Sequence, residues 1–255
     1  MTTEPRASAS VVLLRDDRGN GLEVLLLRRH TASSSWGGAY VFPGGKLDAA
    51  DCAPGGAEGW HRSAASLHAA LGEPDLPMAQ AVGLYVAAAR ETREECGVLL
   101  DTQDLAPWSH WITPLQPSSG TSKRFDTRFF VAVLPSGQEP VHDNVEAVDS
   151  LWLTPREALQ RWWDQRIELA PPQIMNLVSL VPHADVTSVL RAARAKRPVR
   201  VLPEAFVAAD GRRFLCYPGD PQHSVSERAQ VGPTRMGYFD GRFGPEGGLM
   251  TLLDV

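Results

Sequence analysis

The chain has 255 residues, of which 43% are hydrophobic and 22% charged, and its formal net charge is −5. This is the composition of an ordinary globular protein, long enough for one large domain or for one standard domain with an appendage. The negative charge argues against nucleic acid or an anionic membrane as the main partner, and no apolar run is long enough to span a bilayer.

The first third of the chain has the signature of antiparallel strands. Residues Ser8–Leu14 and Leu22–Leu27 are both rich in β-branched and aliphatic side chains, and Asn20-Gly21 lies between them. Asn-Gly is the strongest short hairpin signal, so the two segments are predicted to pair. A short strand, Tyr40–Phe42, follows and should stop at Pro43 because proline cannot donate to a strand ladder.

The middle of the chain contains a segment whose composition indicates an insertion, followed by a strongly predicted helix. Residues 48–77 are dominated by Ala, Gly and Pro and read as an insertion, with a short helix over Ser63–Leu71. Met78–Cys96 is predicted to be a long helix, because Pro77 suits a helix start and Gly97 suits its end. The helix is expected to turn four residues toward the core: Val82, Val86, Ala89 and Cys96.

The remaining elements alternate between strand and helix, which indicates a mixed α/β protein. Strands are predicted at Phe129–Leu134 and Leu151–Leu153. Helices are predicted at 154–165, where Thr154 and Pro155 form the start, and at 173–181 and 187–195. From Val199 the chain is strand-like again, with hairpin signals at Asp210-Gly211 and Asp240-Gly241.

Three glutamates on the long helix are the main functional signal. Glu91, Glu94 and Glu95 are spaced i, i+3 and i+4, which places their carboxylates on one helix face. Like charges at this spacing cost roughly 0.2–0.5 kcal/mol per pair, so the cluster suggests a bound cation. Hard ions such as Mg²⁺ or Mn²⁺ prefer carboxylate oxygens. Upstream, Phe42-Pro43-Gly44-Gly45 forms a strand that runs into a glycine turn, as in a metal-dependent pyrophosphate hydrolase.

This combination resembles the Nudix hydrolases, whose box is G-x5-E-x7-R-E-U-x-E-E-x-G-U with U a bulky apolar residue. Here the box is interrupted: Arg90 follows Gly45 by 45 positions where the family has 14, so the insertion is 31 residues long. Counted back from Arg90, the box glutamate falls on Val82 and is missing, and Thr92 replaces an apolar residue. The resemblance implies an α/β fold, a Nudix-type αβα sandwich with a mixed sheet. The expected division is a Nudix domain at 8–165, with the insertion at about 48–77, and a C-terminal extension at 166–255 packed on the core.

A second resemblance narrows the substrate. The segment from Leu25 to Gly45 is similar to a motif of coenzyme A-cleaving Nudix enzymes. Its matches are Leu25-Leu26, Arg29, Gly38 and Phe42-Pro43-Gly44-Gly45, and its departures are Leu27, His30, Ser34 and Tyr40. The segments 123–130, 169–173 and 217–220 also look like the animal acyl-coenzyme A diphosphatase branch.

The resemblance implies roles for particular residues. Glu91, Glu94 and Glu95, with the backbone carbonyl of Gly45, would bind Mg²⁺ or Mn²⁺. Glu91 or Glu146 would be the general base, and Arg90 would brace the loop by ion pairing rather than touch substrate. The basic residues Arg29, Lys123, Arg124 and Arg128 are candidates for binding substrate phosphates, including the 3′-phosphate of coenzyme A; a solvated strand entry is an equal alternative for the last three.

The expected activity is hydrolysis of the diphosphate in coenzyme A or acyl-coenzyme A, giving adenosine 3′,5′-bisphosphate and (acyl-)4′-phosphopantetheine. The alternatives are a Nudix hydrolase of ADP-ribose, NADH or another dinucleotide, and a Nudix module that senses nucleotides without catalysis. The partner is thus a small nucleotide, not nucleic acid or membrane, and a homodimer is left open. Three separated cysteines, Cys52, Cys96 and Cys216, and a start without an apolar leader indicate the cytoplasm.

Overall fold

The computed structural model describes residues 4–32, 37–53, 62–115, 124–239 and 241–255. Ser34, Lys123 and Asp240, named above, lie outside these ranges. The strands are β1 (Arg6–Asp17), β2 (Gly21–Arg29), β3 (Tyr40–Val41), β4 (Gly44–Lys46), β5 (Ala106–Ile112), β6 (Phe125–Val133), β7 (Ala147–Leu153), β8 (Arg200–Val201), β9 (Glu204–Val207), β10 (Arg213–Cys216), β11 (Arg235–Phe239) and β12 (Arg242–Gly244). The helices are α1 (Ala64–Leu71), α2 (Met78–Cys96), α3 (Pro155–Trp163), α4 (Pro171–Leu180), α5 (Val186–Ala195) and α6 (Met250–Leu253), with 3₁₀ turns η1 (Ala49–Cys52) and η2 (Thr102–Asp104).

The main sheet has eight strands and is mixed, as expected for the predicted fold class. Its order is β3-β2-β1-β6-β5-β8, with β4 also paired to β1 and β7 also paired to β2. β1 and β6 run parallel over nine residue pairs, β5 and β8 also run parallel, and the other pairs are antiparallel. The predicted first hairpin is confirmed by the pairing of Asp17 with Gly21.

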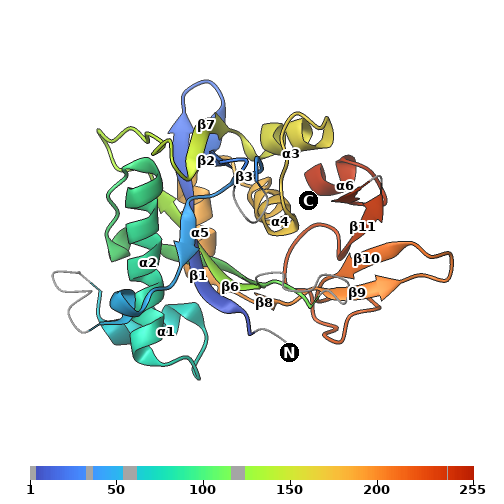
Figure 1. The fold of residues 1–255 in the computed structure, drawn as a ribbon, viewed down its shortest axis with the longest axis horizontal. Helices are drawn as coiled ribbons and strands as arrows, with labels where there is room; N and C mark the ends of the chain where they lie inside the picture. The colour runs from blue at the N-terminus through green and yellow to red at the C-terminus, as the bar shows by residue number, and fades with distance from the viewer. Residues whose placement is uncertain (1–3, 33–36, 54–61, 116–123, 240) are drawn as a thin grey trace.

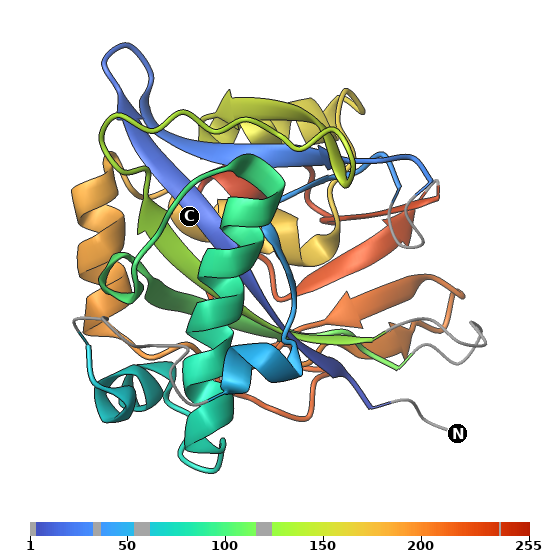
Figure 2. The same cartoon turned by 60° about the vertical axis from the view of Figure 1, so that its left-hand side comes forward.

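Both faces of this sheet are covered by helices, and β1 shows why. Successive side chains of a strand point to opposite faces. Accordingly Ala9, Val11 and Leu13 join the cluster that α1 and α2 bury, whereas Val12 and Leu14 join the cluster that α3, α4 and α5 bury. Figures 1 and 2 show α2 crossing one face, with α3 and α4 on the other side. The result is the predicted αβα sandwich.

Helix α2 has the predicted bounds, but its buried face differs from the expectation. The buried stripe includes Leu84, Tyr85 and Ala88, and Cys96 is buried as predicted. Val82, Val86 and Ala89 are only partly buried. The reason is that α2 also packs against α1, β4 and η1, so the core stripe is rotated toward the sheet and the apolar residues beside it meet these shorter segments.

The C-terminal 90 residues add to the same core and form a second sheet. Strands β9 to β12 make an antiparallel sheet in the order β12-β11-β10-β9, at the right of Figure 1. The predicted hairpin at Asp210-Gly211 is confirmed as the β9–β10 turn, where Gly211 has φ +84°. Tyr217, Met236 and Leu252 are buried in the cluster that α3, α4 and α5 share with the main sheet.

Two further elements differ from those predicted. β5 was not predicted, and α4 begins at Pro171 rather than after the two prolines. Proline is accepted in the first turn of a helix because the N–H it lacks would have no partner there. Among the described residues, no helix is both long and apolar enough to cross a membrane.

Candidate active site

The three glutamates lie in the C-terminal half of α2, but they do not have equal surroundings. Glu91 and Glu95 are one turn apart and face β4, with side-chain exposure of 14% for Glu91 and whole-residue exposure of 6% for Glu95. The side chain of Glu94 is 57% exposed, because a step of three residues turns it to the solvent side of the helix. Gly97, at φ +72°, ends the helix with its N–H bonded to the carbonyl of Arg93.

Two glycines allow the β4 segment to approach these carboxylates closely. The N–H of Gly44 donates to Oε2 of Glu95 at 2.9 Å. A Cβ on Gly45 would collide with the carboxylate of Glu91, and a Cβ on Gly44 would collide with the backbone of β1 at Ala9 and Ser10. Another residue at Gly44 would therefore push β4 away from β1, and another residue at Gly45 would displace the carboxylate of Glu91.

Arg90 holds the parts of the site together, which confirms the expected bracing role. Its Nη1 donates to Oε1 of Glu91 and to Oε2 of Glu94, each at 2.9 Å. Its Nε and Nη2 make a bidentate pair with the carboxylate of Asp51, both at 2.9 Å, and Nη2 also donates to the carbonyl of Lys46 at 3.1 Å. One guanidinium thus connects the glycine turn, η1 and the glutamate helix.

Asp51 corrects the expectation that the acidic residue of the box is missing. Counting back from Arg90 gave Val82, which lies on α2 and is only partly buried. Counting forward from Gly45 by the same pattern gives Asp51, which is buried and bonded to Arg90. The inserted residues therefore follow the acidic residue of the box. Asp51 stands where the box pattern has a glutamate, and it pairs with Arg90 although its side chain is one methylene shorter. The signal was present in the sequence as the G-x5-D spacing.

The carboxylates raise one another's proton affinity. Burial raises the pKa of Glu95 to about 8, the nearby charges of Glu91 and Glu146 add to the shift, and the Gly44 N–H and the charge of Arg29 oppose it. Burial also raises the pKa of Glu91, where Arg90 opposes the shift and Glu94 and Glu146 add to it. Four carboxylates from two distant segments therefore share one electrostatic environment.

The charges of Glu146 and Arg29, which act on Glu95, come from the end of β2 and the residue before β7. The N–H of His30 donates to the carbonyl of Glu146 at 2.9 Å, and Arg29 pairs with Ala147 across β2 and β7. The carboxylate of Glu146 is exposed and has no ion pair with any described residue. Nε of Arg29 is buried and has no hydrogen-bond partner among the described residues. The site thus presents an open carboxylate and a guanidinium with an unused donor.

The carboxylates of Glu91, Glu94 and Glu95 are ligands of the type that a hard divalent cation prefers, although their oxygens do not yet surround a common centre. Among the described residues, no three acidic, His or Cys side chains already form a metal-binding group. Arg90 draws Glu91 and Glu94 toward itself, whereas Glu95 is buried against a backbone N–H and has no ion pair with a described residue. These carboxylates repel one another, and one of them is buried without an ion pair to a described residue. Mg²⁺ or Mn²⁺ would stabilise such an all-oxygen set.

Arg124 and Arg128, the described residues of the predicted 123–128 basic cluster, both have partners within the protein. Arg128 is a correction: its side chain is 5% exposed and bound to Glu73 at 2.5 Å and to Asp126 at 2.7 Å. A guanidinium neutralised by two carboxylates inside the protein is not available to substrate phosphate. Arg124 donates from Nε to the carbonyl of Thr113 at 2.9 Å, at the start of β6. Asp149, near Glu146 in sequence, accepts from the hydroxyl of Tyr40 at 2.7 Å and ties β7 to β3.

Comparisons with known proteins agree with this geometry. A family model described as the NUDT19 Nudix domain matches residues 101–180. The chain is 28% identical to "Acyl-coenzyme A diphosphatase NUDT19" of Gallus gallus, over 84% of this chain and 78% of that protein. The protein of the same name from Homo sapiens is 27% identical, over 81% of this chain and 73% of its own length.

A solved structure, a NUDIX hydrolase from Alicyclobacillus acidocaldarius, shares the fold. Its TM-score is 0.59 at 23% sequence identity, covering 78% of this chain and 99% of that one. The glycine turn, the glutamate helix and these likenesses together support a place for the chain in the Nudix family, where it resembles the acyl-coenzyme A diphosphatase branch.

Proposed function

We propose that the chain hydrolyses the diphosphate of coenzyme A or acyl-coenzyme A, giving adenosine 3′,5′-bisphosphate and (acyl-)4′-phosphopantetheine. The observation that carries the proposal is the buried carboxylate of Glu95, which is held against Gly44 beside other carboxylates and has no ion pair with a described residue. Such a group is costly in the free protein and becomes favourable when a cation and a polyanionic substrate enter together.

The proposed ligands of Mg²⁺ or Mn²⁺ are Glu91, Glu94 and Glu95, with the carbonyl of Gly45. Bound there, the cation would supply charge neutralisation for the diphosphate and lower the pKa of an attacking water. Arg90 positions two of the ligands, and Asp51 in turn positions Arg90. Arg29, through its unused Nε, is the proposed ligand for a phosphate oxygen.

Glu146 is the proposed general base. Glu91, the alternative, is held by Arg90 and largely buried, so a proton placed on it would break an ion pair. Glu146 is exposed, has no ion pair among the described residues, and is near enough to both buried glutamates to shift their pKa values. Its carboxylate is therefore free to accept a proton from water at Oε and release it to solvent.

A substrate panel tests the proposed function. Phosphate-containing products should be measured with Mg²⁺ and with Mn²⁺ for coenzyme A, acyl-coenzyme A, dephospho-coenzyme A, NADH and ADP-ribose. We expect the highest kcat/KM for the two coenzyme A species, as the names of the relatives suggest. Preference for ADP-ribose or NADH would support the other dinucleotide activity, and no turnover of any compound would support a sensing module.

The same panel tests recognition of the 3′-phosphate. If Arg124 reads this group, dephospho-coenzyme A should have a kcat/KM about tenfold lower than coenzyme A, since a hydrogen bond to a charged group contributes about 1.5–3 kcal/mol. Arg124→Ala should reduce that difference, whereas Arg166→Ala, which removes an exposed arginine from another surface, should not. Equal efficiency on both substrates in the unchanged protein would refute the role of Arg124.

Asp51→Asn tests whether Arg90 needs its partner. The change keeps the side-chain shape and removes the charge that orients Nε and Nη2 of Arg90. We expect kcat to fall about 10–100-fold, which is typical of residues that support metal ligands, together with weaker Mg²⁺ activation. Asp48→Asn is the matched control, since Asp48 is 67% exposed and 3.8 Å from Arg90. Equal rates in the two variants would show that Asp51 has no positioning role.

The raised pKa of Glu95 predicts how stability depends on pH. The folded protein keeps a proton on Glu95 up to about pH 8, whereas a glutamate loses it near its ordinary value of 4.5 when unfolded. The folded state thus binds more protons in this window, so the free energy of unfolding should fall as pH rises from 4.5 to 8. Mg²⁺ must displace that proton, so the rise in Tm caused by saturating Mg²⁺ should be larger at pH 8 than at pH 6.

Thermal unfolding with and without Mg²⁺ at the two pH values measures this effect. Glu95→Gln should remove the difference between them, because glutamine does not titrate. A rise in Tm that is the same at both pH values in the unchanged protein would contradict the assignment of Glu95 as a ligand.

A further inference from the structure

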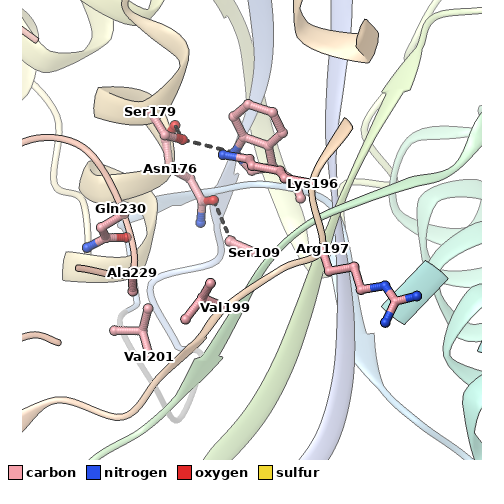
Figure 3. Close-up of a pocket in the computed structure, with 10 residues that line it drawn as sticks. Ser109, Asn176, Ser179, Lys196, Arg197, Val199, Val201, Ala229 and Gln230 are labelled. Carbon is pink, nitrogen blue, oxygen red and sulfur yellow. Dashed lines mark hydrogen bonds between the residues drawn. The ribbon is translucent and has the colours of Figure 1, made fainter. Parts of the chain in front are cut away.

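A small cavity lies on the face of the sheet opposite α2. It is enclosed by β5, α4, the segment that follows α5, and residues 229 and 230, and its volume is about 40 Å³. Figure 3 shows Ser109, Asn176, Ser179 and Gln230 around it, with Arg197 directed away. Because β5 and α4 belong to the core cluster that α2 does not contact, this cavity is separate from the carboxylate site.

Most of the side-chain hydrogen-bond acceptors in the polar wall of the cavity already receive a hydrogen bond from another protein group. The indole N–H of Trp108 donates to Oγ of Ser179 at 2.9 Å, and that hydroxyl donates to the carbonyl of Asn176 at 2.7 Å. Oγ of Ser109 donates to Oδ1 of Asn176 at 2.7 Å, while Nδ2 of Asn176 donates to the carbonyl of Pro172 at 2.9 Å. Each hydroxyl proton is therefore directed into the protein, and the amide of Asn176 retains one N–H.

Hydrogen-bond donors remain in excess. Nε2 of Gln230 is buried and has no partner among the described residues. Nζ of Lys196 lies 4.7 Å from the centre of the Trp108 ring and makes no ion pair with any described carboxylate. The residues that line the cavity include no acid, and their cations are Lys196 and Arg197, of which Arg197 is directed away. A ligand that completes this site must accept hydrogen bonds and carry negative charge.

We propose that this cavity binds a small oxyanion of the phosphate or carboxylate class. A water needs roughly 10–15 Å³ of such volume, so about 40 Å³ admits a single tetrahedral or planar oxyanion but no nucleotide. Lys196 provides the charge, Gln230 and Asn176 provide N–H donors, and the Trp108 ring holds the ammonium in place by a cation–π contact.

The test is a titration of the ¹⁵N-labelled full chain with sodium phosphate and, separately, sodium acetate. Chloride keeps the ionic strength constant, and a chelator removes divalent metals. We expect the Trp108 indole and Gln230 side-chain amide signals to shift in a saturable way with at least one of the two anions. Shifts that are linear up to the highest concentration, or confined to the region of Arg29, would overturn the proposal, since they indicate bulk ion effects or binding at the carboxylate site.

Three variants then separate this cavity from other basic surfaces. Lys196→Met and Gln230→Leu should each weaken the apparent Kd at least about tenfold, as expected for a lost bond to a charged group. Arg191→Gln removes one positive charge from α5 outside the cavity and should leave the Kd unchanged. If Lys196→Met does not fold, Lys196→Gln replaces it. Equal affinity in all variants would refute the assignment.

Discussion

Glu95→Gln should lower kcat by about 100-fold or more while leaving the fold intact and the free protein no less stable. The amide oxygen of glutamine can still accept the N–H of Gly44, so the contact with the glycine turn is kept. The charge that a divalent cation requires is lost, which accounts for the rate. Because the ionised form of Glu95 is disfavoured by burial, its removal should raise the free energy of unfolding above pH 8.

Glu94→Gln should lower the rate to a similar extent without that gain in stability, since Glu94 is exposed and paired with Arg90. Glu157→Gln is the matched control, because Glu157 is an exposed glutamate with an i, i+4 arginine partner on α3. Steady-state kinetics over a range of Mg²⁺ concentrations, with chemical denaturation of each variant, gives both quantities. Near-normal turnover of Glu95→Gln or Glu94→Gln at saturating Mg²⁺ would remove that residue from the metal site.

The sequence was most informative where function depends on local spacing. The i, i+3, i+4 glutamates and the two glycines are properties of short segments, so the helix face and the close turn could be predicted directly. Asp51 could be found only by counting from the correct end of an interrupted pattern. The G-x5-D spacing is in the sequence, but the ion pair with Arg90 is what shows that the forward count, and not the backward one, finds the box acid.

Non-local contacts explain what could not be predicted. In β5, polar and aromatic residues do not alternate clearly. The strand also has a bulge between Pro107 and Ser109, which interrupts the two-residue alternation by which a strand is predicted. Arg128 looked like an exposed cation because it follows Lys123 and Arg124 in sequence. Its partner Glu73 comes from the insertion, 55 residues earlier, and only the packing of α1 beside α2 and β5 brings the two together.

The insertion is attached to the core by that pair as well as by apolar contacts. Leu67 and Leu71 of α1 are buried, and the hydroxyl of Tyr85 donates to the carbonyl of Leu67 at 3.0 Å. Beyond α1, Glu73 receives both Nε and Nη2 of Arg128. The segment that interrupts the box is thus fixed just before it by the pair of Asp51 with Arg90, and after α1 by the pair of Glu73 with Arg128.

Arg128→Met should therefore destabilise the protein by about 3 kcal/mol, the lower end of the cost of breaking a buried ion pair. The carboxylates of Glu73 and Asp126, each 23% exposed, would keep some water but lose their common cation, and His110 would remain beside them. Hydrogen exchange in α1 should accelerate more than in α5. Arg166→Met is the control: its arginine is 58% exposed, and its ion pair should contribute at most about 1 kcal/mol.

Chemical denaturation and KM for coenzyme A separate this structural role from the phosphate-binding role first suggested by the sequence. If the role of Arg128 is structural, Arg128→Met should lose much stability. At temperatures where this variant is folded, its KM for coenzyme A should change little. Glu73→Gln should reproduce part of the loss, because Arg128 would then retain Asp126 alone. An Arg128→Met protein with unchanged stability but a KM raised tenfold would contradict the buried ion pair and return Arg128 to the substrate site.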